Sequence, residues 1–594
     1  MEKVKKTQIL RIHNSVEEIL YFLYSVFPQF KTSLNGSFPN GISAITIDEL
    51  SLILSDSNKD MVHSITFMKQ ILDKSFLNHE VITIVIENNY VDRVYRDCYY
   101  THFSGKHFEY SRYCKRVLLF QDDQVEAALN LNKSELNESF LGSIVVKPIK
   151  HGAIGRTLLS PSVVFSDGTI NAYIRISEYE IHFCGISLKI KAFPFSMQDK
   201  ETLSCAEITI LNIMDYYSNK YSDYKYTLPS DIYNVLNNSG FERPLPTTGM
   251  SYTMISRLLF EFGFFPKLYV ANEGYSDEQM RRILSYYVES AIPVAVGLRY
   301  DAGYNHSIIC IGHGKTSIDE MTSELYRTFE SGEGSDEESL YVADTANAHS
   351  EIIVMDDNMM PYSTYQFCLE EKSIYSVKDN GLSFGRKISN KSEKDSKIVC
   401  IAVPLYKRMY MDAESARNIC IEVLKDRKIS FKNSMANVLG KTIGSKESPV
   451  VMRLFLASSK TFLADRIEST PRDSALRKIY KSTYFPRFIW VCELYDVENY
   501  ADGYVLGEII LDATASITEN PFDSVISIFY PDLLCLRAFD GKMPKEIFKA
   551  FLHEEEIPSQ GNEIDFIRVK AEQKIWDSPI KMFSSNLDPV RIKE

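Results

Sequence analysis

Apolar positions along the chain follow two periods. Some segments repeat apolar side chains every three or four residues, which predicts amphipathic helices. Others are short apolar runs rich in β-branched residues and bounded by turn residues, which predicts strands. The expected helices include residues 16–27, 59–74, 205–217, 253–262, 276–289, 412–424 and 472–481. The expected strands include residues 81–86, 144–149, 170–176, 181–192, 292–298, 305–313, 340–344, 351–355, 398–403 and 488–494. The mixture predicts a multidomain α+β or α/β protein.

Breaks in this pattern suggest where domains begin and end. A chain of 594 residues is long enough for about three or four domains. We expect an N-terminal α/β domain at residues 1–164 and a central domain at 165–380. A polar linker at 381–397 then leads to a C-terminal α/β domain at 398–594. An acidic insert at residues 315–340 interrupts the central domain and is expected to be a solvated loop, with the weaker alternative that it covers a site or attracts basic substrates.

Charge narrows the range of partners. The formal net charge of −13 argues against a general nucleic-acid-binding protein. Residues 90–116 do interleave tyrosine and phenylalanine with arginine and lysine, a pattern that can stack single-stranded nucleic acid. In an acidic chain we favour the other interpretation, in which the rings pack in a core and the charged ends reach solvent.

Cysteine usage and hydropathy suggest the cellular setting. The ten cysteines are scattered and form no CxxC pair, so the sequence has no zinc-ribbon or redox signature. No apolar run approaches the roughly 20 residues of a membrane span, and the first apolar run lacks the features of a signal peptide. We therefore expect a cytoplasmic protein with reduced thiols and no membrane partner, and we expect no cofactor.

One cysteine has a distinctive setting. Ser204 and Glu207 form the pattern of a helix capping box, which makes Ser204 the expected N-cap and Cys205 the first helical residue. Backbone N–H groups and the positive end of the helix dipole would then surround the sulfur. Such a setting favours a thiolate, the nucleophilic form of cysteine.

Three further residues complete a possible catalytic group. Gln198 precedes Cys205 by seven residues and could donate to an oxyanion together with the Cys205 N–H. His306 opens the strand at 305–313, where a general base can lie at the rim of a sheet. Asp344 ends the next expected strand, so it could orient the His306 ring, with Asn347 as the alternative third member. His313, at the far end of the same strand, is interpreted as a turn residue.

These residues, in this order, resemble the papain-like cysteine peptidases. Gln198, the helix opened by Cys205 and Ala206, His306 at the start of an apolar strand, and Asp344 after a hairpin are most similar to the bacteriocin-processing, double-glycine leader peptidases and their free-standing bacterial relatives. The resemblance covers roughly residues 165–380. It implies a Cys-bearing helix packed on an antiparallel sheet that carries the histidine and the acid, and it implies no metal.

The expected activity is hydrolysis of a peptide or isopeptide bond in a peptide or protein substrate. Two alternatives stay open: the same triad could transfer an acyl group or deamidate glutamine, or the chain could be a non-catalytic scaffold with a peptidase-like fold. We expect the flanking domains to select the substrate or to bind a protein partner.

Overall fold

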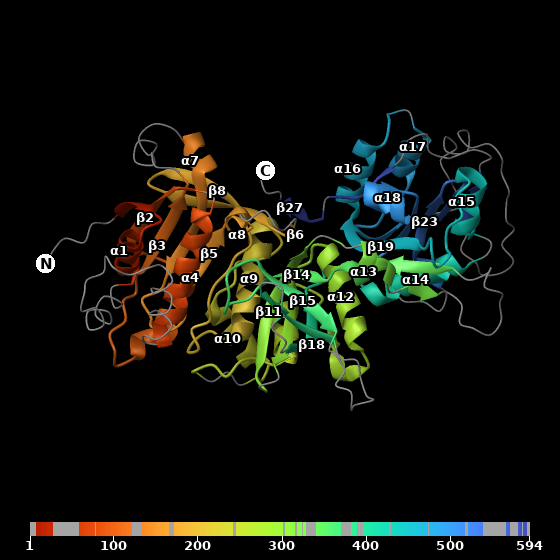
Figure 1. Ribbon diagram of the computed structural model, residues 1–594. Coiled ribbons are helices and arrows are strands. Elements are labelled where there is room, and N and C mark those ends of the chain that lie inside the picture. The colour runs from red at the N-terminus through yellow and green to blue at the C-terminus, as the bar shows by residue number, and fades with distance from the viewer. Residues whose placement is uncertain are drawn as a thin grey trace, which may run out of the picture.

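The computed structural model contains several antiparallel sheets with helices packed against them, a mixed α+β protein with more than one sheet (Figure 1). None of the described helices is both long and apolar enough to cross a membrane. The described residues are 7–27, 59–77, 79–121, 133–165, 172–241, 245–300, 303–314, 316, 318–323, 325–327, 340–369, 382–388, 391–392, 396–426, 429–472, 474–516, 521–537, 566–570, 580–584 and 586–590.

The N-terminal region contains a five-stranded antiparallel meander with helices α1 and α4 beside it. Its strands pair in chain order, and a hairpin of strands β7 and β8 follows later in the sequence. The elements are β1 (Thr7–His13), α1 (Val16–Val26), α4 (Lys59–Phe76), β2 (Val81–Tyr90), β3 (Cys114–Phe120), β4 (Phe140–Val146), β5 (Ile154–Leu159), β7 (Ser177–Phe183) and β8 (Ile186–Ala192).

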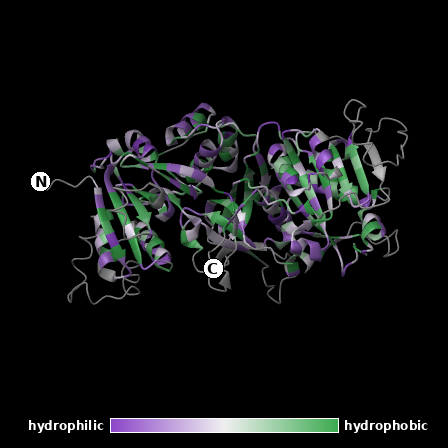
Figure 2. Cartoon of the chain, turned by 90° about the horizontal axis from the view of Figure 1, so that it is seen from above, coloured by the Kyte–Doolittle hydropathy of each residue, from purple (hydrophilic) through white to green (hydrophobic). Residues whose placement is uncertain are grey.

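The meander is covered on both faces, which explains why β2 is almost continuously apolar. Ile82, Ile84 and Ile86 pack in one core with α1 and α4. Val85, which points to the opposite face, packs in a second core with the β7–β8 hairpin. The strands of this sheet are correspondingly hydrophobic along their length (Figure 2).

The central sheet carries the elements of interest for chemistry. Within the described residues it has ten strands, all paired antiparallel: a path β17-β16-β15-β14-β11-β10-β18-β9, with β6 added beside β11 and β27 beside β6. The strands are β6 (Ala172–Ile174), β9 (Lys267–Val270), β10 (Val294–Tyr300), β11 (Asn305–His313), β14 (Glu351–Met355), β15 (Ser363–Leu369), β16 (Leu382–Ile388), β17 (Lys391–Ser392), β18 (Ser396–Val403) and β27 (Asp588–Val590). Helices α9 (Cys205–Lys220), α10 (Pro229–Asn238), α11 (Tyr252–Glu261) and α12 (Asp277–Glu289) accompany it.

A second large sheet belongs to the C-terminal region. Its described order is β12-β13-β19-β20-β22-β23-β24-β25, antiparallel except for the parallel pair β13–β19. These strands are β12 (Leu325–Arg327), β13 (Tyr341–Asp344), β19 (Val450–Ser458), β20 (Phe488–Tyr495), β22 (Gly507–Asp512), β23 (Val525–Tyr530), β24 (Leu533–Arg537) and β25 (Phe566–Lys570). Helices of this region include α14 (Ala413–Lys425), α16 (Ser459–Ser469), α17 (Ala475–Ser482) and α18 (Val497–Asp502).

The two large sheets exchange strands across the expected domain boundaries. Strand β18, expected to open the C-terminal domain, lies between β10 and β9 of the central sheet. Strand β13, expected in the central sheet, pairs instead with β19. The chain end also returns to the centre, because β27 pairs with β6. Sequence pattern locates a strand but not its partner, and here the partners are distant in sequence.

The acidic insert is partly structured. The helix α13 (Ile318–Ser323) and strand β12 fall within residues 315–340, and the side chain of Met321 is fully buried. The expectation of a solvated loop is therefore wrong for this first part of the insert, where apolar residues interrupt the acidic run. Residues 328–339 lie outside the described part of the chain.

The aromatic and basic stretch is divided between core and surface. Tyr95 and Phe103, near helix α5 (Arg93–Thr101), are buried, whereas Tyr100 and Phe108 are more than half exposed. The expected packing of rings in a core holds for the first pair and not for the second.

Candidate active site

Cys205 stands at the position that the sequence predicts. Ser204 is the N-cap of α9 and Cys205 is its first residue. The Glu207 carboxylate accepts the Ser204 backbone N–H at 2.7 Å and also the Ser204 hydroxyl, which fixes the entry into the helix. Glu207 is fully buried, and Thr247 Oγ1 donates to its other oxygen at 3.1 Å. The sulfur is therefore held at a well-anchored helix N-terminus.

A buried aspartate shapes the loop that leads to Cys205. Asp199 Oδ1 accepts the backbone N–H groups of Glu201, Thr202 and Leu203 at 3.0, 2.7 and 2.9 Å. Its Oδ2 accepts the Thr202 hydroxyl at 2.6 Å. One carboxylate thus satisfies four donors in five residues, so the loop can be tight and still leave no backbone donor unpaired.

The N-terminal region supports the same loop from outside. Phe195 and Thr157 exchange backbone hydrogen bonds, and the Met197 N–H donates to Ile154 O at 3.0 Å, so the segment before Gln198 extends the edge of β5. Gly152 has a positive φ of 54°, and a Cβ there would lie 1.8 Å from Gln198 O. Only glycine allows this close approach of the two backbones.

Helix α9 brings Cys205 to His306. One helical turn beyond Cys205, Thr209 Oγ1 lies 3.1 Å from Ser307 Oγ, a buried hydrogen bond between α9 and β11. His306, the second residue of β11, is 6% exposed. The Cys205 thiol is close enough to the His306 ring to be one of the neighbours that raise the pKa of that ring. The two residues predicted as nucleophile and base are therefore together.

The acid on His306 is Asp356, which directly follows β14. Asp356 Oδ1 lies 2.8 Å from His306 Nε2 and accepts the Asn358 N–H at 2.9 Å. Its Oδ2 accepts the Tyr365 hydroxyl at 2.6 Å. Strands β11 and β14 are paired neighbours, so the start of one and the end of the other lie at the same edge of the sheet. Asp357 is also near, with Oδ1 3.4 Å from His306 Nε2.

Burial and hydrogen bonding set the charges of this group. Burial alone would lower the pKa of His306, but Asp356, Cys205 and Asp357 outweigh it and raise the pKa to about 11. Burial alone would raise the pKa of Asp356, yet the bonds from His306 and Tyr365 hold it below its ordinary value. Burial and the neighbouring Asp356 raise the pKa of Asp357 to about 7. At neutral pH the arrangement contains an imidazolium and a carboxylate.

Gln198 joins the group through Asn358. Its Nε2 donates to Asn358 Oδ1 at 3.2 Å, and Asn358 Nδ2 lies 3.2 Å from His306 Nε2. An amide NH₂ carries two donors, and the bond to Asn358 uses one of them. Gln198 is thus hydrogen-bonded to a residue that contacts the histidine.

The predicted pairing of Asp344 with His306 is wrong. Asp344 ends β13, which belongs to the C-terminal sheet, and its Oδ2 accepts from the Tyr286 hydroxyl at 2.5 Å and from Arg417 Nε at 3.1 Å. Its Oδ1 accepts the Ala346 N–H. Asn347, the alternative, uses its backbone carbonyl to accept from Arg281. The acidic insert separates this segment from β11, so the next strand in the sequence is not the next strand in the sheet.

Sequence reasoning missed Asp356, Asp357 and Asn358. A signal for them existed, because the expected strand at 351–355 ends directly in this polar run. A carboxylate at the end of a strand is as favourable a candidate there as it is at Asp344.

Exposure separates Cys205 from most other cysteines. Of the nine cysteines whose side chains are described, all free, seven are buried, Cys184 is exposed and Cys205 is partly buried. Cys184 lies in the turn between β7 and β8, outside any cluster of titratable groups described above. His306, Asp356 and Asp357 also have donor atoms close enough together to hold a cation.

Comparison with known proteins adds no assignment. No protein-family model matches the sequence, and no curated protein matches it either.

Proposed function

We propose that the chain is a cysteine peptidase or isopeptidase with Cys205 as nucleophile, His306 as general acid and base, and Asp356 as the residue that orients His306. The observation that carries this proposal is the hydrogen bond between His306 and Asp356 in a histidine that has the Cys205 thiol as its other polar neighbour. A helix that begins with the cysteine and contacts an antiparallel strand bearing the histidine is the arrangement that the papain-like resemblance implies.

Each step of the reaction has a residue available. A charged imidazolium beside a sulfur favours the thiolate, which attacks the carbonyl carbon of the substrate. Because His306 Nε2 faces Asp356, Nδ1 is the nitrogen left to exchange a proton with the sulfur and then with the leaving amine. Water then attacks the thioester, His306 takes its proton, and the acid product leaves with the thiol restored.

The oxyanion donors follow from the same site. The Cys205 N–H is one of the donors at the start of α9 that have no carbonyl partner within the helix. Gln198 supplies a side-chain amide on the loop shaped by Asp199. Together they would stabilise the negative oxygen of the tetrahedral intermediate, a role in which one donor is worth about 10²-fold to 10³-fold in kcat.

Labelling with iodoacetamide at about pH 6 tests the nucleophile, since an ordinary thiol with a pKa of about 8.5 is almost entirely protonated there. We expect Cys205 to be alkylated at least about tenfold faster than the exposed Cys184, by peptide mass spectrometry. His306→Ala should remove this advantage, and Cys184→Ser should leave it intact. Equal rates at Cys205 and Cys184 in the unmodified chain would contradict the proposal.

The reaction type needs a second measurement. Incubation with a peptide library in the presence and absence of an added amine separates hydrolysis from acyl transfer, and a mass gain of about one dalton at glutamine marks deamidation. Cleaved peptides absent from the Cys205→Ser protein are the expected result. Rapid labelling without any product would favour the scaffold alternative.

A further inference from the structure

A second cluster of buried titratable side chains lies at the opposite end of β11. Glu289 is the last residue of α12, His313 is the last residue of β11, and His349 caps the short helix η5 (Thr345–Ala348). Their exposed fractions are 6%, 5% and 3%. His306 and His313 are seven residues apart on an extended strand, so this cluster lies about 23 Å from the candidate active site.

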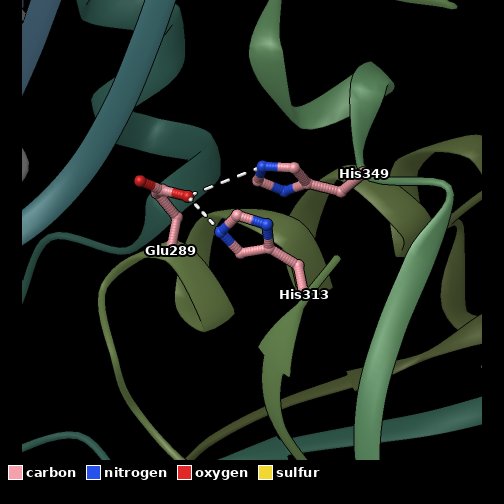
Figure 3. A group of neighbouring side chains, drawn as sticks. All are labelled: Glu289, His313 and His349. Atoms are coloured by element: carbon pink, nitrogen blue, oxygen red, sulfur yellow. Dashed lines mark ion pairs between the residues drawn. The ribbon is translucent and has the colours of Figure 1, made fainter. Parts of the chain in front are cut away.

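The three side chains converge on one point. Glu289 Oε2 lies 3.0 Å from His313 Nε2 and 3.5 Å from His349 Nε2, and both rings direct a nitrogen at this oxygen (Figure 3). The rings are stacked, with centroids 4.1 Å apart. Three potential ligand atoms from three separate elements are thereby within 4.8 Å of one another.

The hydrogen bond that His313 makes to the backbone determines which of its two ring nitrogens carries a lone pair. Its Nδ1 lies 2.7 Å from the carbonyl oxygen of Gly314, and because a carbonyl can only accept, Nδ1 carries the hydrogen. In the neutral ring, Nε2 is then an acceptor that faces a carboxylate oxygen. Two acceptors 3.0 Å apart require a proton or a bound cation between them.

His349 strengthens the case for a cation. Its Nδ1 is buried and has no hydrogen-bond partner among the described residues, and its Nε2 is too far from Glu289 for a normal hydrogen bond. The Nε2 of this ring is directed at the same carboxylate oxygen as the Nε2 of His313. A proton between Glu289 and His313 would leave His349 Nε2 without a normal hydrogen bond, whereas a cation at this point can be bound by all three side chains.

We propose that Glu289, His313 and His349 bind one zinc ion. Around a tetrahedral zinc with bonds of about 2.0–2.1 Å, ligand atoms lie about 3.3 Å apart, which the observed 3.0 and 3.5 Å bracket. The bond from His313 Nδ1 to the Gly314 carbonyl is the outer contact that fixes a metal-binding histidine in the required tautomer.

Arg453 determines which carboxylate oxygen is available. Its Nε donates to Glu289 Oε1 at 2.8 Å, and its Nη1 donates to Glu493 Oε2 at 2.7 Å. The guanidinium is thus balanced by two carboxylates and holds Glu289 in place, with Oε2 left toward the histidines. Arg453 acts here as a positioning residue for the zinc ligand.

The fourth zinc position opens to a cavity. A cavity of about 990 Å³ is lined by Glu289, His313 and His349 together with Tyr173, Arg453 and Tyr500. Three protein ligands with an open position are typical of zinc sites that bind water or a substrate atom. The zinc would therefore carry a water molecule or a donor atom of a small molecule held in the cavity.

Zinc stoichiometry tests the site in the full chain. Because His306, Asp356 and Asp357 could also hold a cation, every protein in the test carries His306→Ala, which removes a member of that second group. After equilibration with buffered micromolar zinc and removal of the excess, elemental analysis should find about one zinc per chain. His349→Phe, which keeps a ring of similar shape, and Glu289→Gln should each lower the affinity at least about tenfold.

The exposed His182 on β7 provides the matched control. His182→Ala should retain the zinc of its parent. A parent without zinc, or a His349→Phe protein with undiminished zinc affinity, would overturn the proposal. If the variants do not fold, X-ray absorption at the zinc edge of the parent still decides: two imidazoles and oxygen ligands are expected, and a coordination shell without imidazole overturns the assignment.

Discussion

At the scale of single residues, the charge on His306 couples the candidate active site to stability. Its pKa rises from 6.5 to about 11 in the folded chain, so the protonated ring stabilises the fold. This contribution is complete below pH 6.5, declines as the pH rises further, and is lost as the pH passes about 11. The stability contributed by protonated His306 is therefore lost at alkaline pH.

The corresponding prediction compares unfolding free energies between about pH 6 and pH 10. The unfolding free energies of the unmodified chain and of the His306→Gln variant should differ most near pH 6, and this difference should decrease steadily toward pH 10. Chemical denaturation at each pH measures it, with His182→Ala as a control that shows no such trend. A difference independent of pH would mean that His306 is not held in its charged form.

Substitutions of Asp356 and of Asp344 should have different effects on the reactivity of Cys205. Asp356→Ala removes the hydrogen bond to His306 Nε2 and should lower the alkylation rate of Cys205 at least about tenfold. Asp344→Asn should leave that rate nearly unchanged, because Asp344 bonds Tyr286 and Arg417 instead. It should lower the unfolding free energy by about 1–3 kcal/mol. Slower alkylation in Asp344→Asn with an unchanged rate in Asp356→Ala would instead identify Asp344 as the residue that orients His306.

Local sequence patterns identify some residues of the candidate active site and miss others. The capping box locates Cys205 because a capped helix start depends on residues three positions apart. His306 is identified because an apolar strand follows it. Asp356 is missed because its place beside His306 depends on which strands pair, and β11 pairs with β14 across an insert that sends β13 to another sheet. Short-range pattern contains no information on that choice.

At the scale of elements, the N-terminus of α9 depends on one buried carboxylate in the preceding loop. Asp199 Oδ1 accepts three backbone N–H groups of the tight turn. Removing a buried acceptor leaves donors unsatisfied at a cost of about 1–3 kcal/mol. The geometry of the Cys205 helix start is therefore maintained from outside the helix.

Asp199→Ala should lower the unfolding free energy by about 3 kcal/mol and slow the alkylation of Cys205. Asp199→Asn keeps the Oδ1 acceptor, so it should cost much less by the same denaturant measurement. If both variants were equally destabilised, the lost charge rather than the backbone bonds would be the cause.

Most element types follow from sequence pattern, and sheet membership does not. The strand β2 and the helix α9 lie where their periods predict, with Val85 on one face and Ile84 on the other as alternation requires. Helix α13 is not predicted from the sequence, because the acidic segment at 315–340 contains too few apolar residues to show a helical period. Its buried Met321 is recognised only from the packed structure.

At the scale of the whole molecule, the exchange of strands makes the central sheet depend on residues past the expected linker. A chain cut after residue 380 lacks β18, the strand that pairs with β10 on one side and with β9 on the other. We expect residues 1–380 alone to lack a cooperative unfolding transition by circular dichroism. Co-expression with residues 381–594 should restore a soluble complex with such a transition. Cooperative unfolding of 1–380 alone would contradict this dependence.

The same exchange of strands has a consequence during synthesis. A ribosome releases the chain from its N-terminus at about 5–20 residues per second, and domains fold as their last strand emerges. Helix α9 leaves the ribosome long before β18, so the sheet behind Cys205 and His306 stays open until residue 403 is exposed. The thiol is therefore synthesised well before the strand that completes the sheet behind it, and we expect nascent chains to be inert toward substrates until β18 has emerged from the ribosome.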